Sequence, residues 1–193
     1  PPRRRDFVEE QLYMVRYSGG LYQVSTSDGS LTLAGAFDKP STTGFTYDTQ
    51  TGKAYIVVYE DGGSNLYEIS LADGSLSLVG TINNGLIIGI AMDGDGHLYG
   101  IDLGDDQLYS INPATGLGTL IGPVGLDLNY AQDIAYDSDN GVLYGTLYEG
   151  GGSGGLYTID TSTGAATLLA AIDAEVDALA IPYGVEYEIA AAA

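Results

Sequence analysis

Short runs of alternating apolar and polar residues, separated by turns that contain glycine, follow one another along most of the chain. A Leu-Tyr pair opens four of these runs, at Leu21, Leu66, Leu108 and Leu156, and each pair is followed at a fixed distance by a glycine. The aligned units read LYQVSTSDGSLTLAG, LYEISLADGSLSLVG, LYSINPATGLGTLIG and LYTIDTSTGAATLLA. Alternation on both sides of a glycine turn is the period-2 pattern of a β-hairpin.

A second hairpin is predicted between successive units, in residues 45–57, 89–101 and 134–146. Each of these segments has an apolar strand, a turn with Asp and Gly, and another apolar strand. Two hairpins per repeat give four short strands per repeat. This is the strand count and length of one β-propeller blade.

The strand order at the two ends of the chain predicts a closed ring. With strands named A to D from the centre outward, the chain starts at strand B (residues 11–17) and ends with strand A (residues 177–183). That last strand would complete the first blade, so we expect an all-β propeller with four blades of four antiparallel strands, closed by its C-terminal strand. Residues 1–10 are then a leader or linker, 11–183 the propeller domain, and 184–193 a C-terminal strand or tail. A β-sandwich is the alternative, but it does not explain a four-strand period.

Segments near the C-terminus carry a resemblance to known repeats. They read AQDIAYDSDNGVLYGTLY (131–148), LYTIDTSTGAATLL (156–169) and AEVDALAIPY (174–183). They resemble the extracellular β-propeller-like repeats of bacterial secreted and surface proteins of the adhesin-type and anchored kinds, and the resemblance extends over residues 11–183. It implies a secreted or cell-surface location and a non-catalytic role in binding or surface assembly. It carries over no catalytic residue.

Acidic residues dominate the composition, with 26 Asp and Glu against six Lys and Arg and a formal net charge of −20. Three of the bases stand together at Arg3–Arg5. Binding of nucleic acid needs clustered bases to displace counterions, so we expect no nucleic-acid partner. No apolar run reaches the length of about 18 residues that spans a membrane, so we expect no membrane insertion. The chain has no cysteine, which excludes disulfides and thiol chemistry. The acidity suits a secreted protein, a cation-binding surface or a salty habitat.

Asp93 and Asp95 form the candidate metal site. Spaced carboxylates in a glycine-rich turn can bind Ca²⁺, the one cofactor that the sequence suggests. The further ligands of an EF-hand loop do not follow. Asp48 and Asp137 occupy the equivalent position in sister repeats, so the alternative is an ordinary turn in which Asp accepts hydrogen bonds from its own backbone.

His97 is the only histidine and lies close to Asp95, where it could act as a base. Lys53 and Val142 replace it in the sister repeats, which predicts an exposed strand position instead. No Ser-His-Asp set is in view, so we expect no enzyme. A propeller hydrolase or lyase that uses paired carboxylates is the alternative.

The Leu-Tyr pairs could form an aromatic ligand platform or pack between blades. Because they recur in every predicted blade, we expect them to pack between blades, with the phenol reaching solvent or a backbone partner.

Ligands of propellers usually bind at the end where the D–A and B–C loops meet, an analogy at the level of the fold. The longest D–A loop, residues 122–133, presents a tyrosine among amides and carboxylates, which is the best candidate for a binding site. The predicted partner is a protein or a second copy of the chain, with a glycan as the alternative. A solvated acidic rim would have the same composition. The candidate residues are Asp127, Asn129, Tyr130 and Gln132 of this loop and Glu60, Asp61, Asp105 and Asp106 of the B–C loops.

Val185, Tyr187 and Ile189 alternate with glutamates near the C-terminus, which predicts a strand with one apolar face. A closed ring leaves this strand no place, so we expect it to pair with another subunit or with a further domain. That makes a structural subunit of an extracellular polymer or fibre an alternative function. A frayed terminus is the other interpretation.

Overall fold

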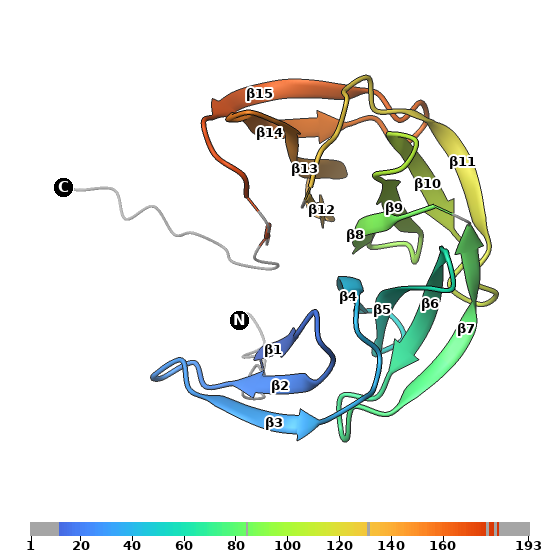
Figure 1. Cartoon of the computed structure of the whole chain (residues 1–193), viewed down its shortest axis with the longest axis vertical. Helices are drawn as coiled ribbons and strands as arrows, with labels where there is room; N and C mark the ends of the chain where they lie inside the picture. Colours follow the sequence, from blue (N-terminus) through green and yellow to red (C-terminus); the bar gives the residue numbers. More distant parts are fainter. Residues whose placement is uncertain (1–11, 84, 131, 177, 180, 182–193) are drawn as a thin grey trace, which may run out of the picture.

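The computed structural model describes residues 12–83, 85–130, 132–176, 178–179 and 181. In these residues the chain forms fifteen strands and no helix. The strands make four antiparallel sheets that stand side by side as an arc around a common centre (Figure 1). The protein is therefore an all-β, four-bladed propeller, as the four-strand period predicts.

Each sheet is one blade, and its strands follow one another from the centre outward. The first blade has three strands, β1 (Leu12–Val15), β2 (Leu21–Val24) and β3 (Leu31–Gly35). The second has β4 (Thr42–Asp48), β5 (Lys53–Glu60), β6 (Gly63–Ile69) and β7 (Leu76–Asn83). The third has β8 (Ile87–Met92), β9 (Leu98–Asp102), β10 (Gln107–Ile111) and β11 (Gly118–Pro123). The fourth has β12 (Asp133–Asp137), β13 (Val142–Gly150), β14 (Ser153–Ile159) and β15 (Ala166–Ile172).

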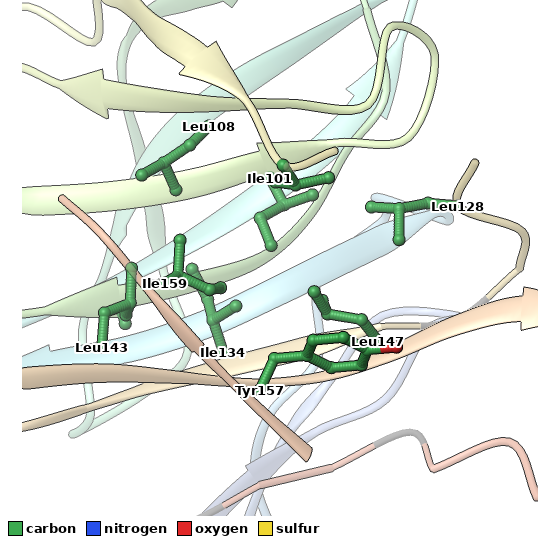
Figure 2. Packing of buried hydrophobic residues seen from close by; sticks show 10 residues of the cluster. Ile101, Leu108, Leu128, Ile134, Leu143, Leu147, Tyr157 and Ile159 are labelled. Carbon is green, nitrogen blue, oxygen red and sulfur yellow. The ribbon is translucent and has the colours of Figure 1, made fainter. Parts of the chain in front are cut away.

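Apolar clusters fill the spaces between consecutive blades. Leu21, Leu66 and Leu108, the leucines of the first three Leu-Tyr pairs, are fully buried, each in a different cluster. Figure 2 shows the cluster between the third and fourth blades, where Leu108 lies among side chains such as Ile159. The leucines of the first three pairs therefore pack between blades as expected, and their burial helps to hold the arc together.

Glycines allow the outer edges of neighbouring blades to come close. A Cβ atom on Gly35 would lie 1.7 Å from the carbonyl oxygen of Asp73, in the β6–β7 turn of the next blade. A Cβ atom built on Gly80 would lie 2.1 Å from a carbonyl oxygen of the next blade, and one built on Gly122 would lie 2.2 Å from the corresponding oxygen. Only a residue without a side chain fits at these three positions.

Three residues of the predicted last strand are described, Ala178, Leu179 and Ile181, and the last two lie at the centre of the arc. Leu179 and Ile181 line a cavity of about 170 Å³ together with residues of β4, β8 and β12. Residues 177, 180 and 182–183, the leader 1–10 and the tail 184–193 with Val185, Tyr187 and Ile189 lie outside the described residues. Closure of the first blade by the last strand, and the pairing of the tail, remain predictions.

Candidate functional site

The connections after β3, β7 and β11 meet the turns after β1, β5, β9 and β13 at one end of the propeller, here called the loop end. Four non-glycine residues have a positive φ in the described chain, and all four lie at this end. They are Ser41 (66°), Asp61 (53°), Asp106 (57°) and Tyr130 (61°). A left-handed backbone is unfavourable for a bulky side chain, and such residues concentrate at functional sites. Tyr130 is also 65% exposed.

Gln132 fixes the long loop that carries Tyr130. Its side chain is buried, and its Nε2 donates hydrogen bonds to the carbonyl oxygens of Asn129 and Tyr148, both at 2.9 Å. Its Oε1 accepts a hydrogen bond from the Tyr148 amide at 2.6 Å. Gln132 therefore positions the loop from inside, while Asp127, Asn129 and Tyr130 are exposed around it.

Asp106 connects the same loop to the third blade. Its Oδ1 accepts a hydrogen bond from the Leu128 amide at 3.0 Å, and its carbonyl oxygen accepts one from the Val124 amide. The neighbouring Asp105 is exposed and accepts a hydrogen bond from the Tyr109 hydroxyl at 2.8 Å. Burial and then this bond raise the pKa of Tyr109 to about 12, so the phenol keeps its proton. The structure thus brings Asp105 and Asp106 together with the Tyr130 loop.

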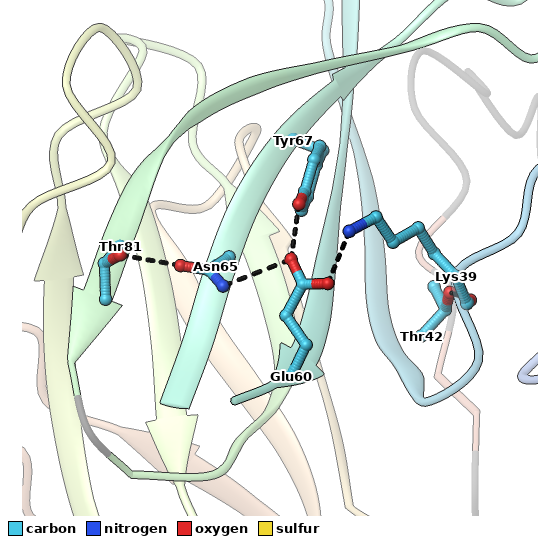
Figure 3. A network of polar contacts seen from close by, with 6 residues as sticks. All are labelled: Lys39, Thr42, Glu60, Asn65, Tyr67 and Thr81. Carbon is cyan, nitrogen blue, oxygen red and sulfur yellow. Dashed lines mark hydrogen bonds and ion pairs between the residues drawn. The ribbon is translucent and has the colours of Figure 1, made fainter. Parts of the chain in front are cut away.

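Glu60 belongs to a separate polar network on the second blade (Figure 3). Its Oε2 lies 2.5 Å from Lys39 Nζ, and its Oε1 accepts hydrogen bonds from the Tyr67 hydroxyl and, at 3.2 Å, from Asn65 Nδ2. Burial opposes the charge, but the bonds from Lys39 and Tyr67 outweigh it and lower the pKa of Glu60. The hydrogen bond to Glu60 also raises the pKa of Lys39. Both groups are therefore charged at neutral pH, beside the exposed, left-handed Asp61.

Lys39 is a residue of the loop end that the sequence analysis did not select as a candidate. The signal was present, because Lys39 is one of only three bases beyond Arg5 in an acidic chain. Its Nζ also lies 5.2 Å from the centre of the Tyr67 ring, within the range of a cation–π contact. The phenol of Tyr67 reaches the carboxylate of Glu60 at the end of β5, and that of Tyr109 reaches Asp105 in the turn after β9. The expectation of solvent or a backbone partner was wrong for these two, because an acid at the end of β5 and one in the turn after β9 lie within their reach.

Asp93 and His97 lie at the opposite end, in the turn between β8 and β9. The buried Asp93 carboxylate accepts hydrogen bonds from the Asp95 and His97 amides, both at 2.8 Å, and lies 2.7 Å from His97 Nδ1. Asp48 bonds its own turn in the same way through the Gln50 amide. This is the ordinary-turn arrangement. Among the described residues no three His, Asp or Glu side chains are close enough to hold a metal ion. Calcium at Asp93 and Asp95 stays a prediction.

At the centre, Asp133 meets the C-terminal segment. Its Oδ2 accepts a hydrogen bond from the Leu179 amide at 2.7 Å, and its Oδ1 accepts one from the Ile134 amide at 2.9 Å. Burial outweighs these bonds and raises the pKa of Asp133 to about 6. Asp133 is a carboxylate that titrates close to neutral pH in an otherwise apolar stretch of the cavity.

Comparison with known proteins adds a family match and a fold. Residues 92–181, most of the third blade and all of the fourth, match the family described as a domain of unknown function, DUF4394. No curated protein matches the chain significantly. No helix in the described residues is long and apolar enough to cross a membrane.

Several solved structures are similar to the chain. A chain of the nidogen/laminin complex is 17% identical with a TM-score of 0.65 over 83% of this chain and 61% of that one. An auxiliary nutrient binding protein from Bacteroides ovatus is 14% identical with a TM-score of 0.60 over 87% and 40%. A gluconolactonase from Xanthomonas campestris is 16% identical with a TM-score of 0.60 over 86% and 59%. The chain therefore spans less than two thirds of each. Since these neighbours include binding proteins and an enzyme, they share with it the β-propeller fold and no single activity.

Proposed function

We propose that the chain is a non-catalytic binding domain that takes a protein partner at its loop end, with Tyr130 as the central contact. The observation that carries the proposal is the backbone of Tyr130, a left-handed conformation maintained by the buried Gln132 while the ring is 65% exposed. A fixed, exposed aromatic side chain gives a partner much apolar area at a small entropic cost.

The charge around Tyr130 defines the kind of partner. Asp105, Asp106 and Asp127 lie on the same loop or on the turn bonded to it. An acidic rim around an aromatic anchor favours a partner segment that carries Lys or Arg, because complementary charges speed the encounter and suppress wrong partners. The network of Lys39 and Glu60 forms the neighbouring part of the loop end.

A secreted or cell-surface location belongs to the same proposal. It is supported by the resemblance to repeats of bacterial surface proteins. The nidogen/laminin complex and the nutrient binding protein are binding proteins of the same fold, which agrees with a binding role.

Selection of peptides from a random display library tests the proposal. We expect the chain to enrich peptides that contain Lys or Arg, and we expect their affinity to fall at least about tenfold in Tyr130→Ala. Tyr47→Ala is the matched control, because Tyr47 is a 47% exposed tyrosine at the opposite end of β4. Peptides that bind Tyr130→Ala as tightly as the parent chain contradict the proposal. If the chain binds to a glycan array and this binding depends on Tyr130, the partner is a glycan and the proposal of a protein partner is wrong.

A further inference from the structure

A cavity at the centre of the propeller combines a largely apolar lining with one carboxylate. The inner strands β4, β8 and β12 surround it together with Leu179 and Ile181 (Figure 1). Among the apolar residues that the strands contribute are Phe45, Ile90 and Met92. The cavity has a volume of about 170 Å³, and a cavity of about 150 Å³ is enough to hold benzene. It therefore has room for a ligand with a small apolar body.

Asp133 is the carboxylate of this cavity, and its oxygens have capacity for further hydrogen bonds. Oδ2 accepts the bond from the Leu179 amide and Oδ1 the bond from the Ile134 amide, and the described residues supply no other donor. An ionised carboxylate has about four acceptor sites. Asp133 remains partly exposed, so a ligand can reach it from the solvent. Its unused acceptor sites are therefore available to a donor that enters the cavity.

None of the bases in the described chain neutralises Asp133. Lys39 and Lys53 form ion pairs with glutamates, and the guanidinium of Arg16 lies over a tyrosine ring. Because no base offsets its burial, the pKa of Asp133 rises to about 6. A positive charge in the cavity would favour the ionised carboxylate and form a charge-assisted hydrogen bond, which is stronger than a neutral one. The cavity is therefore suited to a cation.

We propose that the cavity binds a small organic cation, an ammonium group on an apolar body, with Asp133 as its counterion. The ammonium group donates hydrogen bonds to the Asp133 oxygens, and the apolar body packs against Phe45, Ile90 and Met92. A metal ion would need several oxygen ligands, whereas no three His, Asp or Glu side chains of the described chain come together to hold one. Tyr130 does not line the cavity, so this site is additional to the protein-binding loop end.

Isothermal titration calorimetry of the full chain with benzylammonium chloride tests the proposal. In about 0.15 M NaCl, which screens the general attraction of an acidic surface, we expect saturable binding at one site. The dissociation constant should rise at least about tenfold in Asp133→Asn, and benzyl alcohol, which lacks the charge, should bind at least about tenfold more weakly. Asp139→Asn is the matched control, since it removes the same charge from an exposed turn of the same blade. A chain that does not bind benzylammonium, or that binds it equally well as Asp133→Asn, overturns the proposal.

The pH dependence of binding gives a second measurement. The dissociation constant for benzylammonium should rise about tenfold from pH 7 to pH 5, because Asp133 takes up its proton over this range. Tyr136, the other titratable residue of the lining, keeps its proton throughout, since burial raises its pKa. An affinity that does not change between these pH values contradicts a role for Asp133 as counterion.

Filling the cavity tests the site without a change of charge. Ala135 lines the cavity and is partly exposed, so Ala135→Leu retains Asp133 but reduces the space for the apolar body. Binding of benzylammonium should weaken at least about tenfold in this variant. Circular dichroism melting establishes that each variant is folded, and Ala135→Leu decides the question if Asp133→Asn does not fold. An unchanged affinity in Ala135→Leu overturns the proposal.

The leader of the chain carries organic cations of its own, at Arg3–Arg5. A full chain with Arg3→Gln, Arg4→Gln and Arg5→Gln distinguishes this source from a free ligand. Equal binding of benzylammonium by this variant and by the parent chain supports a free ligand. If only the variant binds it, the leader occupies the cavity and the proposal of a free ligand is wrong.

Discussion

Gln132 and Tyr148 are joined by two hydrogen bonds, in which the side-chain amide of Gln132 pairs with both the N–H and the C=O of Tyr148. A side chain thus replaces the backbone of a neighbouring strand at the start of β12. Through this pair the conformation of the exposed loop depends on the strand β13.

Replacement of Gln132 by Ala should destabilise the chain and loosen the loop. It leaves the part-buried Tyr148 N–H without its partner, at a cost of about 1–3 kcal/mol, whereas the Tyr148 carbonyl keeps its bond from the Asn129 amide. Urea unfolding measures the loss. Asn129→Ala removes an exposed amide from the same loop and should change the free energy of unfolding by less than about 0.5 kcal/mol. Equal losses in the two variants would mean that Gln132 does not fix the loop.

Gly80→Ala should destabilise strongly, whereas Ala170→Gly should have little effect. The added Cβ lies 2.1 Å from the Thr115 carbonyl oxygen, so the second and third blades must separate, at a cost of about 1–3 kcal/mol or more. Ala170 stands at the equivalent position of the fourth blade, where the described part of the chain places no further blade against it. Thermal melting compares the two variants, and a tolerated Gly80→Ala would contradict the close approach of these blades.

Asp133 should make stability fall as the pH rises through about 6. Its pKa is raised from 3.8 to about 6 in the folded chain, so the folded chain binds this proton more tightly than the unfolded chain. Deprotonation therefore disfavours folding. Melting temperatures between pH 4 and pH 8 test this against Asp133→Asn, in which other carboxylates contribute as before. The difference between the two proteins should change with pH, and a constant difference would show that Asp133 titrates normally.

Salt should stabilise the chain because its net charge of −20 repels itself. The melting temperature should rise between low and moderate NaCl as the Debye length shrinks to about 8 Å. CaCl₂ at equal ionic strength tests the turn of Asp93. If calcium raises the melting temperature further and Asp93→Asn removes only that excess, the turn binds calcium. Equal effects of the two salts would leave no calcium site there.

The repeat and the hairpins were predictable from sequence because they depend on local patterns. The glycines after each Leu-Tyr pair confirm this, since Gly74 and its equivalents have the positive φ that the turns require. The roles at the loop end were less accessible. Gln132 was predicted to contact a ligand because it is a polar residue in the long loop. Its hydrogen bonds instead reach a strand 16 residues away, and only the folded chain shows that its side chain is buried. Lys39 and Glu60 are likewise distant in the sequence, and only the folded chain shows that they form an ion pair.

The departures of the fourth blade from the repeat were visible in the alignment. Ala170 replaces a glycine, and Thr146 replaces the aliphatic residue found as Val57 and Ile101. The consequence of these substitutions depends on which residues face the next blade. The hairpin pattern in the sequence predicts the strands but not the contacts between blades.

The glycine contacts between blades also bear on how such a chain can grow. The third blade carries both halves of the contact: the turn glycine Gly116, which receives the preceding blade, and Gly122, which receives the following one. A tandem duplication of the gene segment for this blade would therefore place matching halves against each other, and the propeller could gain a blade in one genetic event. The fourth blade retains only the receiving half, so duplication of its segment would create a junction that needs a further substitution at Ala170.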